Sequence, residues 1–192
     1  QELKVPVGVI DCTWGGTPAE SWTSAQTLAH VSGYEEHMQQ LAAIGYDENK
    51  AIELYGKASQ EWKARATNID QGFKESWETP STDDHDWEVM TLPCYWESQS
   101  LKNFDGVVWF RKEVEIPAAY EGKEIVLSPG VIDDEDIVYW NGEQVAQGSG
   151  YNVQRHYTIP ADKVHAGLNT LCIRVFDTGG EGGIAGEASK MY

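Results

Sequence analysis

Alternation of apolar and polar side chains is the dominant pattern from Phe104 to Phe176. A period of two is typical of a β-strand with one buried face. The first such strand ends at Pro117, and we expect one face to be apolar apart from Lys112 and the other to be exposed to water. The inward series is Val108, Phe110, Val114 and Ile116, and the outward series is Trp109, Arg111, Glu113 and Glu115.

A β-hairpin is the clearest element within this region. Ile137 to Trp140 is β-branched or aromatic, Asn141-Gly142 suits the two positive-φ positions of a type I′ turn, and Glu143 begins the return strand. Further short strands are expected over 124–128, 157–159 and 170–176. Because no helical pattern separates them, they predict an antiparallel β-sandwich of jelly-roll type. The glycine-rich run 179–183 is expected to be too flexible for a strand.

The middle of the chain, from Tyr34 to about Phe73, has a helical period. Asp47 is placed to cap the start of the main helix. Thr79 to Asp86 contains Pro80 and an acidic run and is expected to be a linker. Its carboxylates and His85 lack the spacing of a metal site, so we expect no metal there. The apolar stripe of the helix, expected to be a packing face, is Ile52, Tyr55, Ser59, Trp62 and Ala66.

A different pattern stands at the start of the chain. Val5 to Ile10 is almost continuously apolar, as in a parallel strand that is covered on both faces. Such a strand needs neighbours, and the strand-helix rhythm that would supply them does not follow. We therefore expect residues 1 to about 30 to be an excerpt of an α/β domain, and the chain to be an internal segment of a longer protein.

Charge and cysteine content restrict the possible partners. The chain has 14 basic and 31 acidic residues and a formal net charge of -17, which disfavours nucleic acid and anionic membranes. Cys12, Cys94 and Cys172 lie far apart and are expected to be buried thiols rather than zinc ligands or a disulfide framework. No cofactor is expected, and neither a membrane span nor a signal peptide is indicated.

Few stretches have the pattern of a catalytic site. There is no Gly-x-Ser-x-Gly elbow, no pair of acidic residues can be placed as a glycosidase pair, and Asp162 and His165 are expected in a surface turn. The exception is the loop Trp14 to Pro18, which follows the apolar strand. Its glycines could offer backbone N–H groups to an oxyanion, or the loop could be a structural turn that leads into a helix.

Two family resemblances combine these patterns. Val5-Pro-Val-Gly-Val-Ile followed by Trp14-Gly-Gly-Thr-Pro-Ala-Glu-Ser-Trp22 resembles the sialate O-acetylesterase family, carbohydrate esterases of the SGNH-hydrolase type. The resemblance implies that Gly15 and Gly16 contribute to the oxyanion hole and that Thr17 shapes the loop and contacts substrate. The Gly-Gln-Ser-Asn nucleophile motif of that family is absent, and Asp162 and His165 do not match its Asp-x-x-His base motif by location, so we expect this chain alone to be inactive.

The later part of the chain is similar to the sugar-binding-like jelly roll at the start of family 2 glycoside hydrolases, a galactose-binding-like domain. The similarity implies that this domain is inserted in the esterase fold. The matching motifs are Gly106-Val-Val-Trp-Phe-Arg111, Asp133-Asp-Glu-Asp136, Tyr139-Trp-Asn-Gly142 and Gly167-Leu-Asn169. The expected parts are residues 1–30 as a fragment of the α/β catalytic domain, 31–86 as helical connector and linker, 87–186 as the β-sandwich, and 187–192 returning toward the catalytic domain.

The function implied by these resemblances is hydrolysis of acetyl esters on sugars by a secreted or periplasmic parent enzyme. Its partners would be an acetylated carbohydrate and the rest of the catalytic domain, with neither nucleic acid nor membrane. The alternative is a non-catalytic sugar-binding module of a family 2 glycoside hydrolase. Trp109 and Arg111 could then contact a sugar, but we favour packing of Trp109 under the connector or against the catalytic domain.

Overall fold

A computed structural model describes residues 17–192, and the chain divides into two compact units, residues 1–60 and 61–192. The expected strand Val5 to Ile10 and the glycines Gly15 and Gly16 lie outside the described residues. The helices are η1 (Ala19–Trp22), α1 (Ala25–Leu28), α2 (Glu35–Ala43), α3 (Glu48–Ile69) and α4 (Gln71–Glu75). No helix within residues 17–192 is long and apolar enough to cross a membrane.

Helix α3 begins where its sequence predicts, because the Asp47 carboxylate accepts a hydrogen bond from the Lys50 amide at 3.1 Å. The expected packing face is only partly buried. Ile52 is 62% exposed and Tyr55 is 77% exposed. Further along the same stripe, and within the second unit, the ring of Trp62 lies 5.2 Å from that of Phe176.

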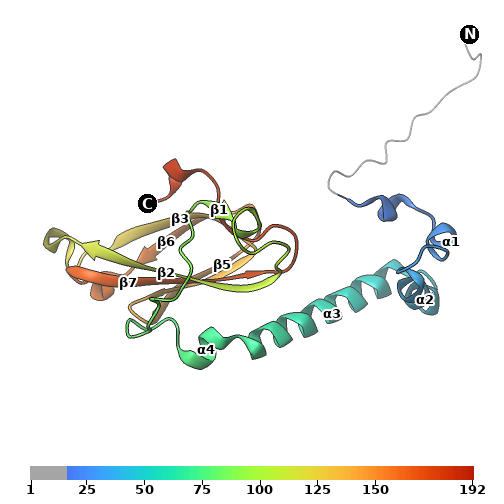
Figure 1. The fold of residues 1–192 in the computed structure, drawn as a ribbon, viewed down its shortest axis with the longest axis horizontal. Coiled ribbons are helices and arrows are strands. Elements are labelled where there is room, and N and C mark those ends of the chain that lie inside the picture. The colour runs from blue at the N-terminus through green and yellow to red at the C-terminus, as the bar shows by residue number, and fades with distance from the viewer. Residues whose placement is uncertain (1–16) are drawn as a thin grey trace, which may run out of the picture. The chain divides into compact units, whose positions relative to one another are not determined.

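The second unit is an antiparallel sandwich of two four-stranded sheets, as the alternation predicts (Figure 1). One sheet has the strand order β1-β8-β3-β6 and the other has the order β2-β7-β4-β5. The strands are β1 (Cys94–Tyr95), β2 (Gly106–Ile116), β3 (Ile125–Asp133), β4 (Glu135–Trp140), β5 (Glu143–Ser149), β6 (Gln154–Ile159), β7 (Gly167–Asp177) and β8 (Gly183–Ala185). Short 3-10 turns are η2 (Trp96–Ser98), η3 (Ala118–Tyr120), η4 (Ala161–Lys163) and η5 (Ala188–Lys190).

The predicted hairpin joins β4 to β5, with Asn141 at φ 52° and Gly142 at φ 87°. The expectation that 179–183 contains no strand residue is wrong at its last position. Gly183 begins β8 and pairs with Tyr95 of β1. A Cβ atom at Gly183 would lie 2.5 Å from the Cys94 carbonyl oxygen, so the glycine is required by the close approach of the two strands rather than by flexibility.

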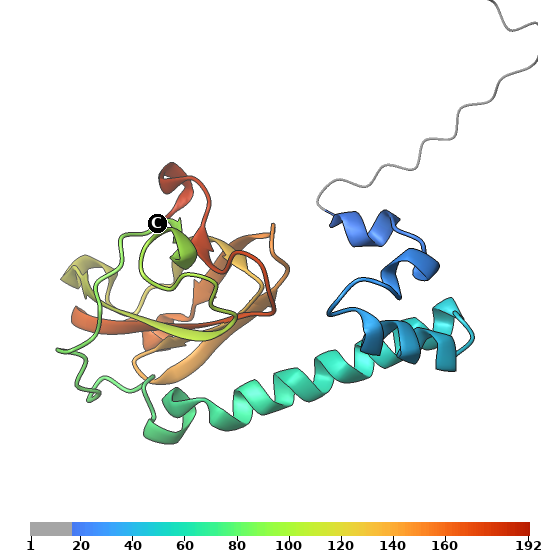
Figure 2. The same cartoon turned by 45° about the vertical axis from the view of Figure 1, so that its right-hand side comes forward.

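The core lies between the two sheets, which Figure 2 shows as separate layers. Its buried residues include Trp96, Ile132, Val138, Val175 and Ile184. A second cluster fills the other end of the sandwich and consists of Ile116, Trp140, Ile159 and Val164. The inward apolar residues of β2 and β7, such as Ile116 and Val175, therefore do build the core.

The last residues of the chain continue this unit. The backbones of Tyr192 and Ser128 exchange two hydrogen bonds, with N···O distances of 2.6 and 3.0 Å. The Ser128 hydroxyl also donates to the Lys190 carbonyl at 2.8 Å. Residues 187–192 thus lie against β3, within the sandwich.

The outer face of the β2-β7-β4-β5 sheet differs most from expectation. The sequence predicts that this face is exposed to water, but Trp109 is 7% exposed, Cys172 0%, Arg174 6% and Phe176 3%. The physical reason is that part of α3, α4 and the residues after it lie across β2 and β7 and remove these side chains from water.

Candidate functional site

The covered part of this outer face is held by one carboxylate. Asp70, between α3 and α4, accepts hydrogen bonds from the Gly72 amide at 2.9 Å, from Trp109 Nε1 at 2.9 Å and from Arg174 Nε at 2.7 Å. A Cβ atom at Gly72 would lie 2.2 Å from the Trp109 ring. Asp70 therefore caps α4 and pairs with a buried arginine, and the missing side chain of Gly72 lets the helix lie directly on the indole.

An aromatic cluster seals this contact. The Trp109 ring lies 5.4 Å from Phe73, 6.3 Å from Trp77 and 5.8 Å from Tyr139, with the first two edge to face. Trp77 in turn lies 5.0 Å from Trp87. Such pairs stabilise a contact beyond the area that they bury. Trp109 is thus a packing residue beneath α4 and has no surface for stacking on a sugar.

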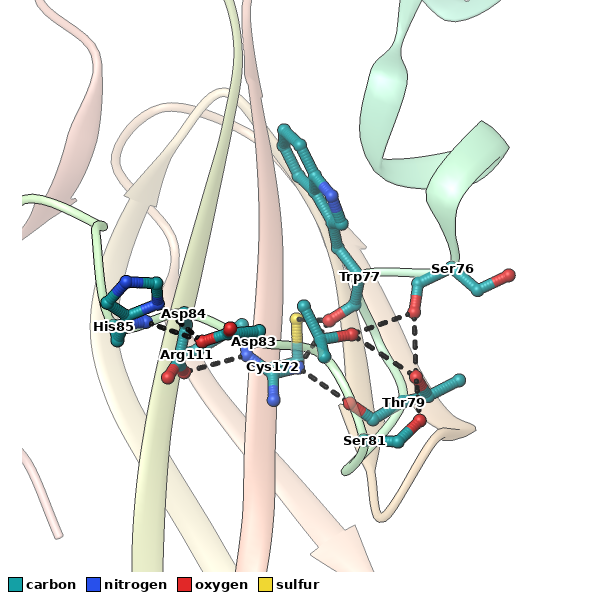
Figure 3. Close-up of polar contacts among 10 residues, drawn as sticks. Ser76, Trp77, Thr79, Ser81, Asp83, Asp84, His85, Arg111 and Cys172 are labelled. Atoms are coloured by element: carbon teal, nitrogen blue, oxygen red, sulfur yellow. Dashed lines mark hydrogen bonds and ion pairs between the residues drawn. The ribbon is translucent and has the colours of Figure 1, made fainter.

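Arg111 is enclosed by the residues that follow α4 (Figure 3). Its Nη1 donates to the carbonyl oxygens of Trp77 and Thr79, and its Nε donates to Asp84 at 3.0 Å. The arginine side chain is 5% exposed. All of these acceptors belong to the chain itself, so the guanidinium is not free to bind the carboxylate of a ligand.

The same segment contains the acidic run and lies against a buried thiol of β7 (Figure 3). Asp83 bonds the His85 ring at 2.7 Å, and both side chains are largely exposed. The Cys172 thiol lies 3.8 Å from the Trp77 carbonyl oxygen, and burial raises the pKa of Cys172 to about 12. The expectation of buried thiols therefore holds for Cys172, whereas Cys94 is only partly buried.

The rest of the outer face, along β4 and β5, is open. A hollow of about 480 Å³ lies there. Its lining residues are Glu135, Asp136, Ile137, Gln147, Gly148, Ser149 and Arg174. Glu135 pairs with Ser149 and Ile137 pairs with Gln147 across the two strands, which puts these four side chains on one face.

Two features shape the floor of this hollow. A Cβ atom at Gly148 would lie 2.3 Å from the Tyr157 hydroxyl and 2.7 Å from Arg155 Nε, so a glycine is needed where β5 crosses these side chains. Asp136 is buried and accepts from Arg155 Nε at 2.8 Å and from the Tyr157 hydroxyl at 2.6 Å. Glu135 at the rim is bonded by Lys63 Nζ. Carboxamide, hydroxyl and charged groups above a fixed floor are the groups that bind sugar hydroxyls.

A second polar cluster lies where β3 meets β4 and β7 ends. Oxygen atoms of Asp133, Asp134 and Asp177 all lie within 4.8 Å of one another. Burial, followed by the neighbouring Asp134, raises the pKa of Asp133 to about 7, and burial raises the pKa of Asp177 to about 6. The sequence shows Asp133 and Asp134 as part of an acidic run but does not place Asp177 beside them.

The residues expected to form a site are thus distributed in three ways. Gly15 and Gly16 lie outside the described residues, and the Thr17 hydroxyl accepts from Trp22 Nε1 at 2.7 Å in the first unit. Trp109 and Arg111 are buried in the second unit.

Sequence reasoning missed the hollow. A β-bulge between Val138 and Tyr139 shifts the pairing, so counting back from the Asn141-Gly142 turn does not place Gln147 opposite Ile137.

The fold and the hollow define a β-sandwich domain with a covered and an open half on one outer face. No protein-family model matches the sequence, and neither does any curated protein. Solved structures do match the sandwich. Bacteroides uniformis beta-glucuronidase 2 is 22% identical with a TM-score of 0.50, over 56% of this chain and 14% of its own. Ruminococcus gnavus beta-glucuronidase is 21% identical with a TM-score of 0.50, over 57% of this chain and 18% of its own.

These likenesses show the fold alone, an antiparallel β-sandwich shared with part of two beta-glucuronidases, and this chain spans less than a fifth of either enzyme. They correct one expectation. The neighbours are glycoside hydrolases, and the interpretation of the parent protein as a carboxylic ester hydrolase is therefore wrong. These likenesses give no support for the SGNH excerpt expected in residues 1–30.

Proposed function

We propose that residues 61–192 form a non-catalytic, sugar-binding β-sandwich module of a glycoside hydrolase of the family 2 type. The observation that carries the proposal is the open hollow between β4 and β5, whose lining residues Gln147, Ser149 and Glu135 supply donors and acceptors for sugar hydroxyls. The fold likeness to two beta-glucuronidases supports the enzyme class. Trp109 and Arg111 have no part in this site because the connector covers them.

The two carboxylates of the hollow are not arranged for glycoside hydrolysis. That reaction needs one carboxyl as acid and a second as nucleophile or base, both facing the bond that is cleaved. Asp136 is buried and bonded by Arg155 and Tyr157, and Glu135 is bonded by Lys63. Both are engaged within the domain, which favours binding over catalysis.

The affinity that such a site can reach is low. A monosaccharide acid has about 13 non-hydrogen atoms, and ~0.3 kcal/mol for each gives roughly -4 kcal/mol, which is a Kd of about 1 mM. The open shape of the hollow allows no more than partial burial of one ring. Binding in the millimolar range is the expected result.

The test is a titration of the full chain with methyl β-D-glucuronide and methyl β-D-glucoside, followed by NMR chemical-shift changes, which detect weak binding. We expect saturable shifts at Gln147 and Ser149. For Gln147→Ala we expect the Kd to rise by about fivefold or more, the change expected from losing about one hydrogen bond. Gln40→Ala, a matched change on α2, should bind as the unaltered chain does. Absence of saturable shifts, or binding that Gln147→Ala leaves unchanged, contradicts the proposal.

A further inference from the structure

The cluster of Asp133, Asp134 and Asp177 is a product of strand pairing. Asp133 is the last residue of β3, Asp134 follows it, and the Asp134 amide donates to the Phe176 carbonyl oxygen at 3.2 Å. This bond brings the end of β7 beside the junction of β3 and β4. Oxygen atoms from all three carboxylates consequently lie within 4.8 Å of one another.

Asp177 is the unusual member of the cluster. Its side chain is fully buried, at 0% exposure. One carboxylate oxygen, Oδ1, accepts from the Gly179 amide at 2.9 Å, but the other, Oδ2, has no hydrogen-bond partner. A buried carboxylate oxygen without a partner is rare in folded proteins, because the loss of its hydration is uncompensated, and it indicates a missing ligand.

Within the described residues, no basic side chain forms an ion pair with these three carboxylates. None of the ion pairs among residues 17–192 includes Asp133, Asp134 or Asp177. Lys63 acts on Asp134 electrostatically, but its Nζ is bonded to Glu135. Further acidic groups, Glu97, Asp105 and Glu181, add negative potential around the cluster. The electrostatic environment therefore favours a cation.

We propose that Asp133, Asp134 and Asp177 bind a divalent cation, Ca²⁺. Calcium binds carboxylate oxygens at about 2.4 Å, so two ligands of one ion lie no more than about 4.8 Å apart, and the oxygen atoms of the cluster meet this limit. Magnesium demands near-octahedral geometry and usually keeps several water ligands with one or two carboxylates, so a set of three protein carboxylates favours calcium. Asp133 and Asp134 are only partly buried, which leaves room for the water ligands that complete a calcium shell.

The ion would join two segments that are distant in sequence. It would hold the junction of β3 and β4 to the end of β7, and through the Gly179 amide bonded to Asp177 it would order the start of the glycine-rich loop that leads into β8. Thr178 already links the same two segments, since its amide donates to Asp134 Oδ2 at 2.9 Å. The inference does not depend on the proposed sugar site, which lies on the outer face along β5.

The experiment measures calcium binding by the full chain after treatment with a chelator. Isothermal titration should show one saturable site, and calcium at about 50 times its Kd should raise the Tm by about 5 °C or more, whereas magnesium at the same concentration should have a smaller effect. Terbium, which replaces calcium and is excited by nearby indoles, gives a direct signal. Trp96 and Asp177 both flank Gly182, so the Trp96 indole lies near the site and should sensitise the terbium luminescence.

Asp177→Asn removes one ligand and the buried charge. We expect this variant to lose the calcium shift and the terbium signal, and to be no less stable than the unaltered chain without calcium, because the unpaired charge is gone. Asp133→Asn is the second variant if Asp177→Asn fails to fold. The matched control is Asp83→Asn, the same change in the exposed acidic run 83–86, and it should keep the full calcium response. No calcium response in the unaltered chain, or equal responses in all variants, overturns the proposal.

Discussion

Removal of the Asp70 carboxylate tests whether the connector is part of the sandwich's folding unit. Asp70→Ala deletes three hydrogen bonds and leaves Arg174, whose side chain is 8% exposed, buried without a counter-charge. Breaking a buried pair costs ~3–5 kcal/mol, and loss of the cap of α4 is part of that loss. At roughly 3–6 °C for each kcal/mol, we expect the Tm to fall by about 15 °C.

The assay is urea unfolding followed by tryptophan fluorescence, because Trp77 and Trp109 report on this interface. Asp70→Asn keeps an oxygen acceptor for the Gly72 amide and removes the charge. Its free energy of unfolding should therefore lie between those of Asp70→Ala and the unaltered chain. Asp47→Ala is the control, since Asp47 caps α3 through one bond to Lys50 and should cost only about 1 kcal/mol. Equal losses of unfolding free energy for Asp70→Ala and Asp47→Ala would show that the buried Asp70–Arg174 pair contributes nothing beyond a helix cap.

Two further predictions concern single sites. Gly183→Ala should destabilise the sandwich by about 1–3 kcal/mol in urea unfolding, because its Cβ would lie 2.5 Å from the Cys94 carbonyl oxygen. Gly179 has a similar φ, and a Cβ atom there would have nothing within 4 Å, so Gly179→Ala should destabilise the sandwich clearly less. An equal loss would show that backbone strain, rather than the close contact with Cys94, sets the cost of both substitutions. In a Cys12→Ser background, iodoacetamide at about pH 8 should label Cys94 at least roughly tenfold faster than Cys172, whose raised pKa and burial suppress the thiolate. Rapid labelling of native Cys172, detected by peptide mass, would contradict the buried position.

Several features of the fold are local and could be predicted from the sequence. The alternation in β2 and β7 indicates a strand with an inward apolar face, and both strands have one. Asn141-Gly142 predicts the hairpin because these residues tolerate positive φ, and Asp47 predicts the start of α3. Each of these outcomes depends on neighbours within a few residues.

The glycine-rich run shows where local reasoning fails. Gly179 and Gly183 have similar φ values, 143° and 145°, yet one stands in open space and the other lies against β1. Glycine content predicts backbone freedom but cannot distinguish a flexible loop from a close approach of two strands. That distinction depends on where Cys94, far away in sequence, is placed.

Hydrophobic period and turn chemistry are properties of consecutive residues, so they predict the two-sheet sandwich, its hairpin and its helical connector. The covering of half of the outer face depends instead on contacts between distant residues, since the Asp70–Arg174 pair joins residues 104 positions apart. The same holds for Asp177, which strand pairing brings beside Asp133 and Asp134. A carboxylate's burial and its partners are properties of non-local contacts, and the pattern of a single strand does not contain them.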